Sequence, residues 1–157
     1  AIETRTGLSL AWQMQQPVCL DEMPLNGHDY LRYAQADRET PPERMLSWLD
    51  RRIDTLSGGQ FQLLAVWAIL AGWADLVLLD EPIAGLTAEE KEETAYRITE
   101  IRGRYKTAVL LVEHDLRIAS RLADRMVALD YGQLIAQGSP DQVQQTPAVI
   151  KAYLGED

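Results

Sequence analysis

The sequence predicts an α/β fold with a mostly parallel sheet. Two apolar runs, Leu76 to Leu79 and Thr107 to Val112, contain no charged residue and predict strands. The first is too apolar for a half-exposed strand and is typical of one buried on both faces. A segment with helical periodicity follows each run, and the order strand, helix, strand, helix implies parallel pairing. Asp80 and Glu81 come directly after the first run, at the end of a strand where ligands bind in open α/β sheets.

The chain before Asp54 predicts a helical subdomain. It has prolines at 17, 24, 41 and 42, no lysine, and short helical patterns in place of apolar strand runs. Thr40-Pro41-Pro42-Glu43 predicts a helix start with a hydroxyl cap, and we expect that helix to end near Asp54. Apolar residues surround nearly the whole of the next helix, Gln60 to Gly72, so we expect it to be deeply packed.

The predicted elements continue after the carboxylates. Thr87 to Glu90 forms a capping box that opens a surface helix ending near Arg102. A further helix, Leu116 to Ala123, follows the second strand. Apolar runs on both sides of Asp130-Tyr131-Gly132-Gln133 predict an antiparallel hairpin, and Ser139-Pro140 opens a terminal helical region.

Composition and charge limit the kinds of partner. A chain of 157 residues can form one unit with a real core, and its net charge of −9 argues against binding nucleic acid or anionic lipid. The single cysteine, Cys19, cannot form an internal disulfide and fits the reducing cytosol. No apolar stretch reaches the roughly 20 residues of a membrane span, so we expect any membrane contact to be made through a partner.

Residues Leu56-Ser57-Gly58-Gly59-Gln60 combine a hydroxyl with bare backbone N–H groups at a helix start. The positive end of a helix dipole in this position binds phosphate. Taken alone, such a pattern is more often a helix cap with a flexible turn. The apolar strand that follows, with its two terminal carboxylates, favours the functional interpretation.

With these residues in view, the chain resembles the nucleotide-binding domain of ABC-type ATPases over nearly its whole length. Leu56 to Gln60 matches the family signature motif, and Leu76 to Glu81 matches the Walker B strand. Ala84-Gly85-Leu86 is similar to the D-loop, and His114 stands where the switch histidine belongs. Leu10-Ala11-Trp12-Gln13 resembles the Q-loop; we favour Gln13 as its glutamine, with Gln15 and Gln16 as the alternatives.

The resemblance implies ATP and Mg²⁺ as ligands and a role for each residue. Asp80 would hold Mg²⁺ through water, and Glu81 would orient the attacking water. His114 could donate a hydrogen bond to the γ-phosphate, although a lone histidine is usually only a surface residue. Gln13 could sense the metal and contact the transport partner. Ser57, Gly58, Gly59 and Gln60 would act on the nucleotide of a second, opposing domain.

The resemblance also divides the chain. We expect the Q-loop region in residues 1–16, the helical subdomain with the signature motif in 17–72, and half of a RecA-like core in 73–157. The fold is then a partial P-loop NTPase fold with an inserted helical subdomain.

The main departure from the family is the Walker A pattern, which occurs nowhere in the sequence. The lysines are Lys91, Lys106 and Lys151; all follow the Walker B strand and none follows a glycine. We therefore expect the carboxyl-terminal part of a larger domain, with exposed strand edges that make the segment unstable, self-associating or completed by another polypeptide. Thr87 is a second departure, because the family usually has aspartate there.

Three functions follow as hypotheses. The first is the ATP-binding and hydrolysing subunit of an ABC transporter, located at the inner membrane face through a transport subunit, with the isolated chain inactive. The second is a non-hydrolytic binding or regulatory module, and the third is a soluble ABC protein without a transport role. The ending Ala152 to Glu156 is similar to the tails of ATPases of amino-acid importers or lipopolysaccharide exporters.

Overall fold

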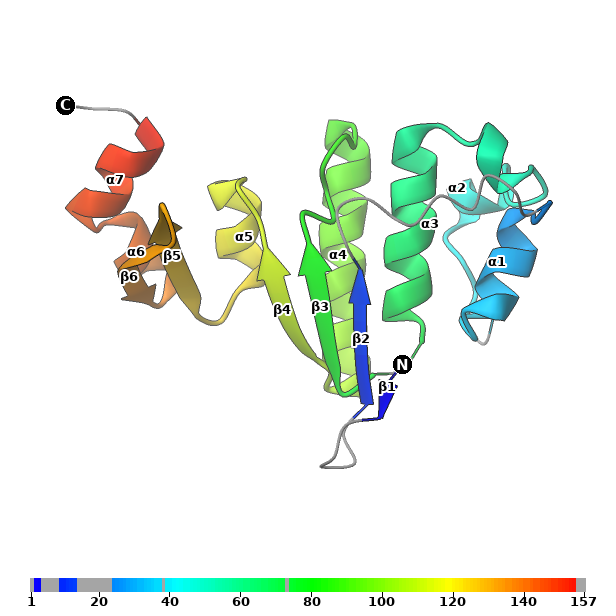
Figure 1. Cartoon of the computed structure of the whole chain (residues 1–157), viewed down its shortest axis with the longest axis horizontal. Coiled ribbons are helices and arrows are strands. Elements are labelled where there is room, and N and C mark those ends of the chain that lie inside the picture. Colours follow the sequence, from blue (N-terminus) through cyan, green and yellow to red (C-terminus); the bar gives the residue numbers. More distant parts are fainter. Residues whose placement is uncertain (1, 4–8, 14–23, 38, 73, 155–157) are drawn as a thin grey trace. The chain divides into compact units, whose positions relative to one another are not determined.

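The computed structural model describes residues 2–3, 9–13, 24–37, 39–72 and 74–154 (Figure 1). The chain divides into two compact units, and the division falls between Glu113 and His114. None of the helices in these ranges is both long and apolar enough to cross a bilayer.

The first unit is built on a sheet of four described strands. They are β1 (Ile2–Glu3), β2 (Ser9–Gln13), β3 (Leu76–Asp80) and β4 (Ala108–Val112), in the order β1-β2-β3-β4. β1 is antiparallel to β2, and β2, β3 and β4 are parallel neighbours. The parallel pairing predicted for the two apolar runs is therefore confirmed.

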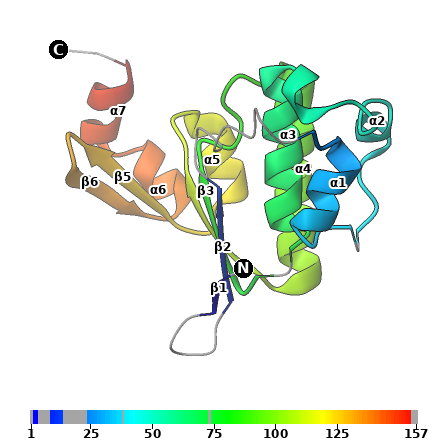
Figure 2. The ribbon, with the colours of Figure 1, turned by 45° about the vertical axis from the view of Figure 1, so that its right-hand side comes forward.

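Two long helices, α3 (Gly58–Leu70) and α4 (Ala88–Tyr105), lie side by side on one face of this sheet (Figure 2). Val77 and Leu79 of β3 are almost fully buried, and the residues beside them in register are on the same face. Residues on the other face alternate with these, and there Leu110 and Val112 are 59% and 54% exposed. The expectation that β3 is buried on both faces is thus wrong for the open face, where Leu76 and Leu78 are only half-buried. No described layer of this unit covers that face.

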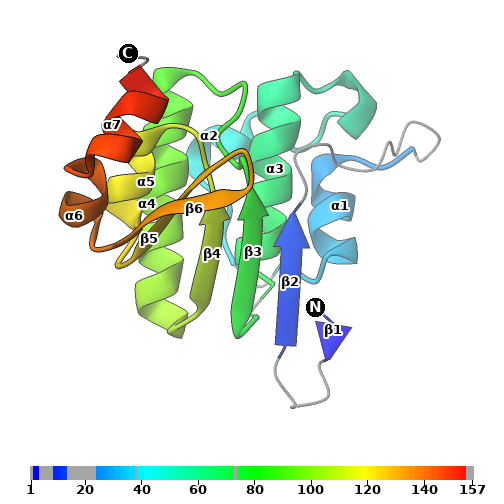
Figure 3. The ribbon, with the colours of Figure 1, turned by 60° about the vertical axis from the view of Figure 1, so that its left-hand side comes forward.

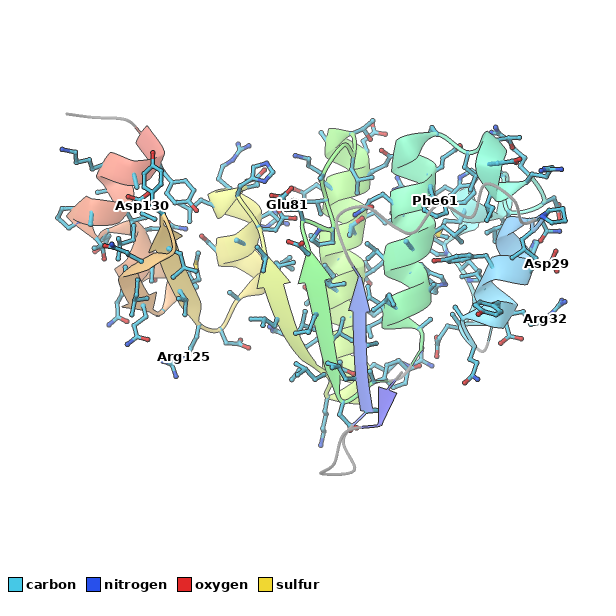
Figure 4. All side chains as sticks on the ribbon, viewed as in Figure 1. Asp29, Arg32, Phe61, Glu81, Arg125 and Asp130 are labelled. Atoms are coloured by element: carbon cyan, nitrogen blue, oxygen red, sulfur yellow. The ribbon has the colours of Figure 1, made fainter. Side chains whose placement is uncertain are left out.

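The predicted deep packing of α3 is confirmed, because every residue from Gln62 to Ala68 is buried. The helix contacts α1 (Gly27–Tyr33), where the ring of Tyr30 packs edge to face against that of Phe61 with their centroids 6.0 Å apart. Phe61 is labelled in Figure 4. Burial raises the pKa of the Tyr30 hydroxyl above its usual range. The described residues from 24 to 57 contain helices and no strand of the sheet, as predicted, but β1 and β2 lie in the stretch before them where only helical patterns were expected.

The helix expected from Glu43 to near Asp54 is much shorter. α2 (Glu43–Leu46) begins after Pro42 without a side-chain cap, and the short 3₁₀ helix η1 (Ile53–Thr55) follows a turn. The backbone between them bonds elsewhere: Leu49 O accepts from Gly27 N at 2.7 Å, and Ile53 N donates to Leu25 O at 3.0 Å. Groups committed to these distant partners cannot continue a helix, which a local pattern does not reveal.

The second unit contains α5 (Leu116–Leu122), the hairpin of β5 (Met126–Asp130) and β6 (Gln133–Gly138), and the helices α6 (Pro140–Gln144) and α7 (Pro147–Leu154) (Figure 3). The antiparallel hairpin and the Ser139-Pro140 helix start are both confirmed. Ala128, Val143 and Val149 form its small buried core.

Candidate functional site

Ser57 begins α3 as its N-cap. The Ser57 hydroxyl oxygen accepts a hydrogen bond from the Gln60 N–H at 3.2 Å, and Gln60 Oε1 accepts one from the Ser57 N–H at 3.0 Å. Gln60 is thus engaged in this capping box. The N–H groups of Gly58 and Gly59, in the first turn, have no acceptor within the helix. We call residues 57–59 the signature tip.

The signature tip lies against the start of α4. A Cβ placed on Gly59 would be 3.4 Å from Glu90 Oε2 and 3.6 Å from the carbonyl oxygen of Gly85. A Cβ on Gly58 would meet nothing within 4 Å. One glycine of the tip therefore contacts the segment after β3, while the other leaves its backbone open to an incoming group.

Asp80 and Glu81 lie at the carboxyl end of β3, as predicted (Figure 4). Asp80 is exposed, and Glu81 has a left-handed backbone with φ +47°. The Glu81 N–H donates to Val112 O at 2.9 Å, and its carbonyl oxygen accepts from Ala84 N at 3.0 Å. A left-handed conformation costs a non-glycine residue about 1–3 kcal/mol, so these bonds hold the chain in a strained turn just where it leaves the sheet.

Two residues near Glu81 were not identified from the sequence. The buried amide Nε2 of Gln62, on α3, donates to the Glu81 carbonyl oxygen at 3.4 Å. Glu113 Oε1 accepts from the Ile83 N–H at 3.2 Å and so holds the segment after Glu81 to the end of β4. The available signal for Gln62 was that it is the one polar residue in the apolar stretch from Phe61 to Leu70; the role of Glu113 depends on the tertiary fold.

For the remaining predicted residues, Gln13 and His114, the structure gives the position of the backbone relative to the strands. Gln13 is the last residue of β2 and pairs with Leu79, so the strands that carry Gln13 and Asp80 end at the same edge of the sheet. Gln15 and Gln16 lie outside the described residues. His114 is the second residue after β4 and begins the second unit, so its position is defined only along the chain.

The carboxylates fit a hard cation that keeps most of its water. Asp80 and Glu81 supply oxygen ligands, which Mg²⁺ prefers, but no group of three or more potential ligands occurs in the described part of the chain. Mg²⁺ is commonly held by one or two carboxylates together with phosphate and water. A cavity of about 280 Å³ beside Trp67, Arg97 and Arg104 includes none of the candidate residues among those that line it.

A parallel sheet with carboxylates at one strand end and a glycine-bearing helix tip beside it defines a P-loop NTPase fold of the ABC type. Solved structures agree. An ATP-binding subunit of an ABC transporter matches with a TM-score of 0.74 and 24% identity over 94% of this chain and 65% of that one. A nucleotide-free ATP-binding cassette from an ABC transporter matches with a TM-score of 0.71 and 23% identity, over 94% of this chain and 69% of that one.

Sequence comparisons give the same family. LivG of Escherichia coli K12, a high-affinity branched-chain amino acid transport ATP-binding protein, is 34% identical over 71% of this chain and 44% of its own length. The zinc import ATP-binding protein ZnuC of Alkalilimnicola ehrlichii is 30% identical over 98% of this chain and 62% of its own length. A model of the branched-chain amino acid ATP-binding cassette transporter matches residues 133–157.

The chain belongs to the family of ABC-type ATP-binding domains, as the sequence motifs predicted. It spans less than half the length of LivG. The family model covers the carboxyl-terminal segment, whose ending was expected to be similar to ATPases of amino-acid importers or lipopolysaccharide exporters.

Proposed function

We propose that this chain forms the signature and Walker B portion of an ABC transporter ATP-binding subunit. The observation that carries the proposal is the connection of two motifs: the helix that starts at Ser57 reaches the carbonyl oxygen of Glu81 through Gln62. Both motifs are therefore part of one packed unit, so a displacement of one would shift the other. The relatives are named for branched-chain amino acid and zinc transport, and their shared property is ATP binding.

The residues would divide the work as follows. The free N–H groups of Gly58 and Gly59, with the Ser57 hydroxyl, face the terminal phosphates of a nucleotide held mainly by an opposing domain. Asp80 would hold Mg²⁺ and Glu81 would orient the water that attacks; Mg²⁺, when bound, would supply charge compensation. Gln13 and His114 would act from the ends of β2 and β4 as contacts to metal and γ-phosphate.

The partners of this proposal are a second nucleotide domain, a membrane transport subunit and a segment with Walker A. The last is supported by β4, whose five residues are all apolar and which lies at the end of the described strand order. Natural edge strands usually carry charge or are covered. A parallel strand added beside β4 would pair its backbone and would bring the phosphate-binding lysine that the sequence lacks.

The test is complementation. The chain is co-expressed with the part of LivG that the match does not cover, and turnover of Mg-ATP is measured for the purified pair and for each part alone. We expect turnover only from the pair, with a loss of at least about 100-fold for Glu81→Gln. Turnover that Glu81→Gln leaves unchanged would refute the assignment of Glu81.

The missing Walker A pattern also favours a second candidate, a binding module that supplies only the signature tip to a complete partner. This candidate predicts that a full nucleotide domain gains activity on adding the chain. In that case Ser57→Ala, but not Glu81→Gln, would remove the gain.

A further inference from the structure

Glu90 holds a carboxylate oxygen in a fixed place beside the signature tip. It is the third residue of α4, where its Oε2 accepts a hydrogen bond from the Thr87 N–H at 2.8 Å and Thr87 Oγ1 accepts one from the Glu90 N–H at 3.3 Å. This capping box fixes the side chain in one orientation. The same Oε2 is the atom that would lie 3.4 Å from a Cβ on Gly59.

Two oxygens approach Gly59 from outside α3. Among the atoms of other segments, the three nearest to the Cβ position of Gly59 are the Glu90 carboxylate oxygen, the carbonyl oxygen of Gly85 and a methyl carbon of Leu86. A helix N-terminus attracts anions because it has a partial positive charge of about half an elementary charge. A fixed carboxylate at this distance offsets that attraction for any phosphate that approaches Gly58 and Gly59.

We propose that Glu90 sets the phosphate affinity of the signature tip and keeps it low. The proposal rests on the phosphate-facing role of the tip given above. The tip then holds a triphosphate only together with other anchors and releases it when those anchors change. In this proposal Glu90 acts through its charge beside the tip and does not bind the phosphate, so it is a positioning residue and not a catalytic one.

The test compares Glu90→Gln with Glu89→Gln in the full chain. Both variants remove one negative charge from the first turn of α4. Glu89 is exposed, however, and none of its atoms is among the three that lie nearest to the Cβ position of Gly59. The glutamine at 90 keeps an oxygen that can accept from Thr87, so the cap is retained; circular dichroism checks this. Tripolyphosphate serves as the probe, and binding is read from hydrogen exchange of the Gly58 and Gly59 amides at constant ionic strength.

We expect Glu90→Gln to lower the half-saturating concentration of tripolyphosphate about threefold to tenfold, and Glu89→Gln to change it less than twofold. Without the probe, amide exchange at Gly58 and Gly59 becomes several-fold faster in Glu90→Gln alone, because the carboxylate no longer repels hydroxide. Equal affinities in the two variants overturn the role of Glu90. Absence of binding in every variant instead refutes the phosphate role of the tip, and the affinity claim with it; a remaining difference in exchange then shows only that the charge reaches the tip.

Discussion

The side-chain amide of Gln62 donates to the backbone carbonyl oxygen of Glu81 across 3.4 Å, and so joins the helix of the signature tip to the end of β3. Glu81 has a φ of +47°, and it carries both a strained backbone and the carboxylate for which we propose a role in hydrolysis. Strain and charge are therefore separate properties of one residue. Glu81→Gln removes the charge alone, Glu81→Gly removes both, and the difference between the two variants reports the strain.

Glu81→Gly is expected to keep or raise the unfolding free energy, because glycine adopts a left-handed backbone without steric cost; the gain is at most about 1 kcal/mol. Glu81→Gln removes the charge and keeps the strain, so its stability should stay within about 0.5 kcal/mol of the wild type. Urea unfolding at fixed protein concentration gives both values. A glycine variant less stable than the glutamine variant by more than about 1 kcal/mol would show that the turn is not strained.

The elements that the sequence predicted correctly depend on local signals. The strand from Leu76, the capping box of Thr87 and the hairpin around Tyr131 follow from side-chain period, caps and turn residues that lie within a few positions of each other. The early end of α2 does not, because it is set by bonds from residues 49 and 53 to residues 25 and 27. The same distinction applies to the candidate site: motif spacing proposed Ser57 and Asp80 as site residues, whereas the contacts of Gln62 and Glu90 arise only when the helices pack.

Gly27→Ala tests the backbone contact that ends α2. A Cβ at this position would lie 2.6 Å from a methyl carbon of Leu49 and 2.9 Å from its carbonyl oxygen, closer than real contacts allow. We expect a loss of about 1–3 kcal/mol in unfolding free energy, measured by urea denaturation. Gly103→Ala is the matched control, since its Cβ would meet nothing within 4 Å inside α4; it should stabilise by about 0.5–1 kcal/mol. Equal effects at the two glycines would contradict the close approach at Leu49.

Asp75 makes stability depend on pH. The N–H and hydroxyl of Ser9 both donate to Asp75 Oδ2 at 2.8 Å, and these bonds lower the pKa of the Asp75 carboxyl. The pKa of Asp75 is lower in the folded state than in the unfolded state. Its ionised carboxylate therefore adds to the free energy of unfolding above the unfolded pKa of about 3.9, and this stabilisation is lost as pH falls through the folded-state pKa. Asp75→Asn should therefore lower the thermal midpoint at pH 7, and the difference from wild type should shrink below pH 4.

Asp37→Asn serves as the control for that pH series, because Asp37 is exposed on the surface. Its midpoint should follow the wild type across the whole range. A gap between Asp75→Asn and wild type that is constant from pH 7 to pH 3 would mean that Ser9 stabilises the strand ends without involving the charge of Asp75.

The open face and edge of β4 should make the isolated chain self-associate. Leu110 and Val112 expose apolar surface on a strand that has no charged residue, and such strands template pairing with other chains. Leu110→Lys places a charge there and should shift sedimentation from concentration-dependent oligomers toward the monomer. Leu46→Lys is the control, because Leu46 is 44% exposed but lies on α2. A wild-type chain that sediments as a monomer at all concentrations and melts cooperatively would contradict both this prediction and the need for a segment that completes the sheet.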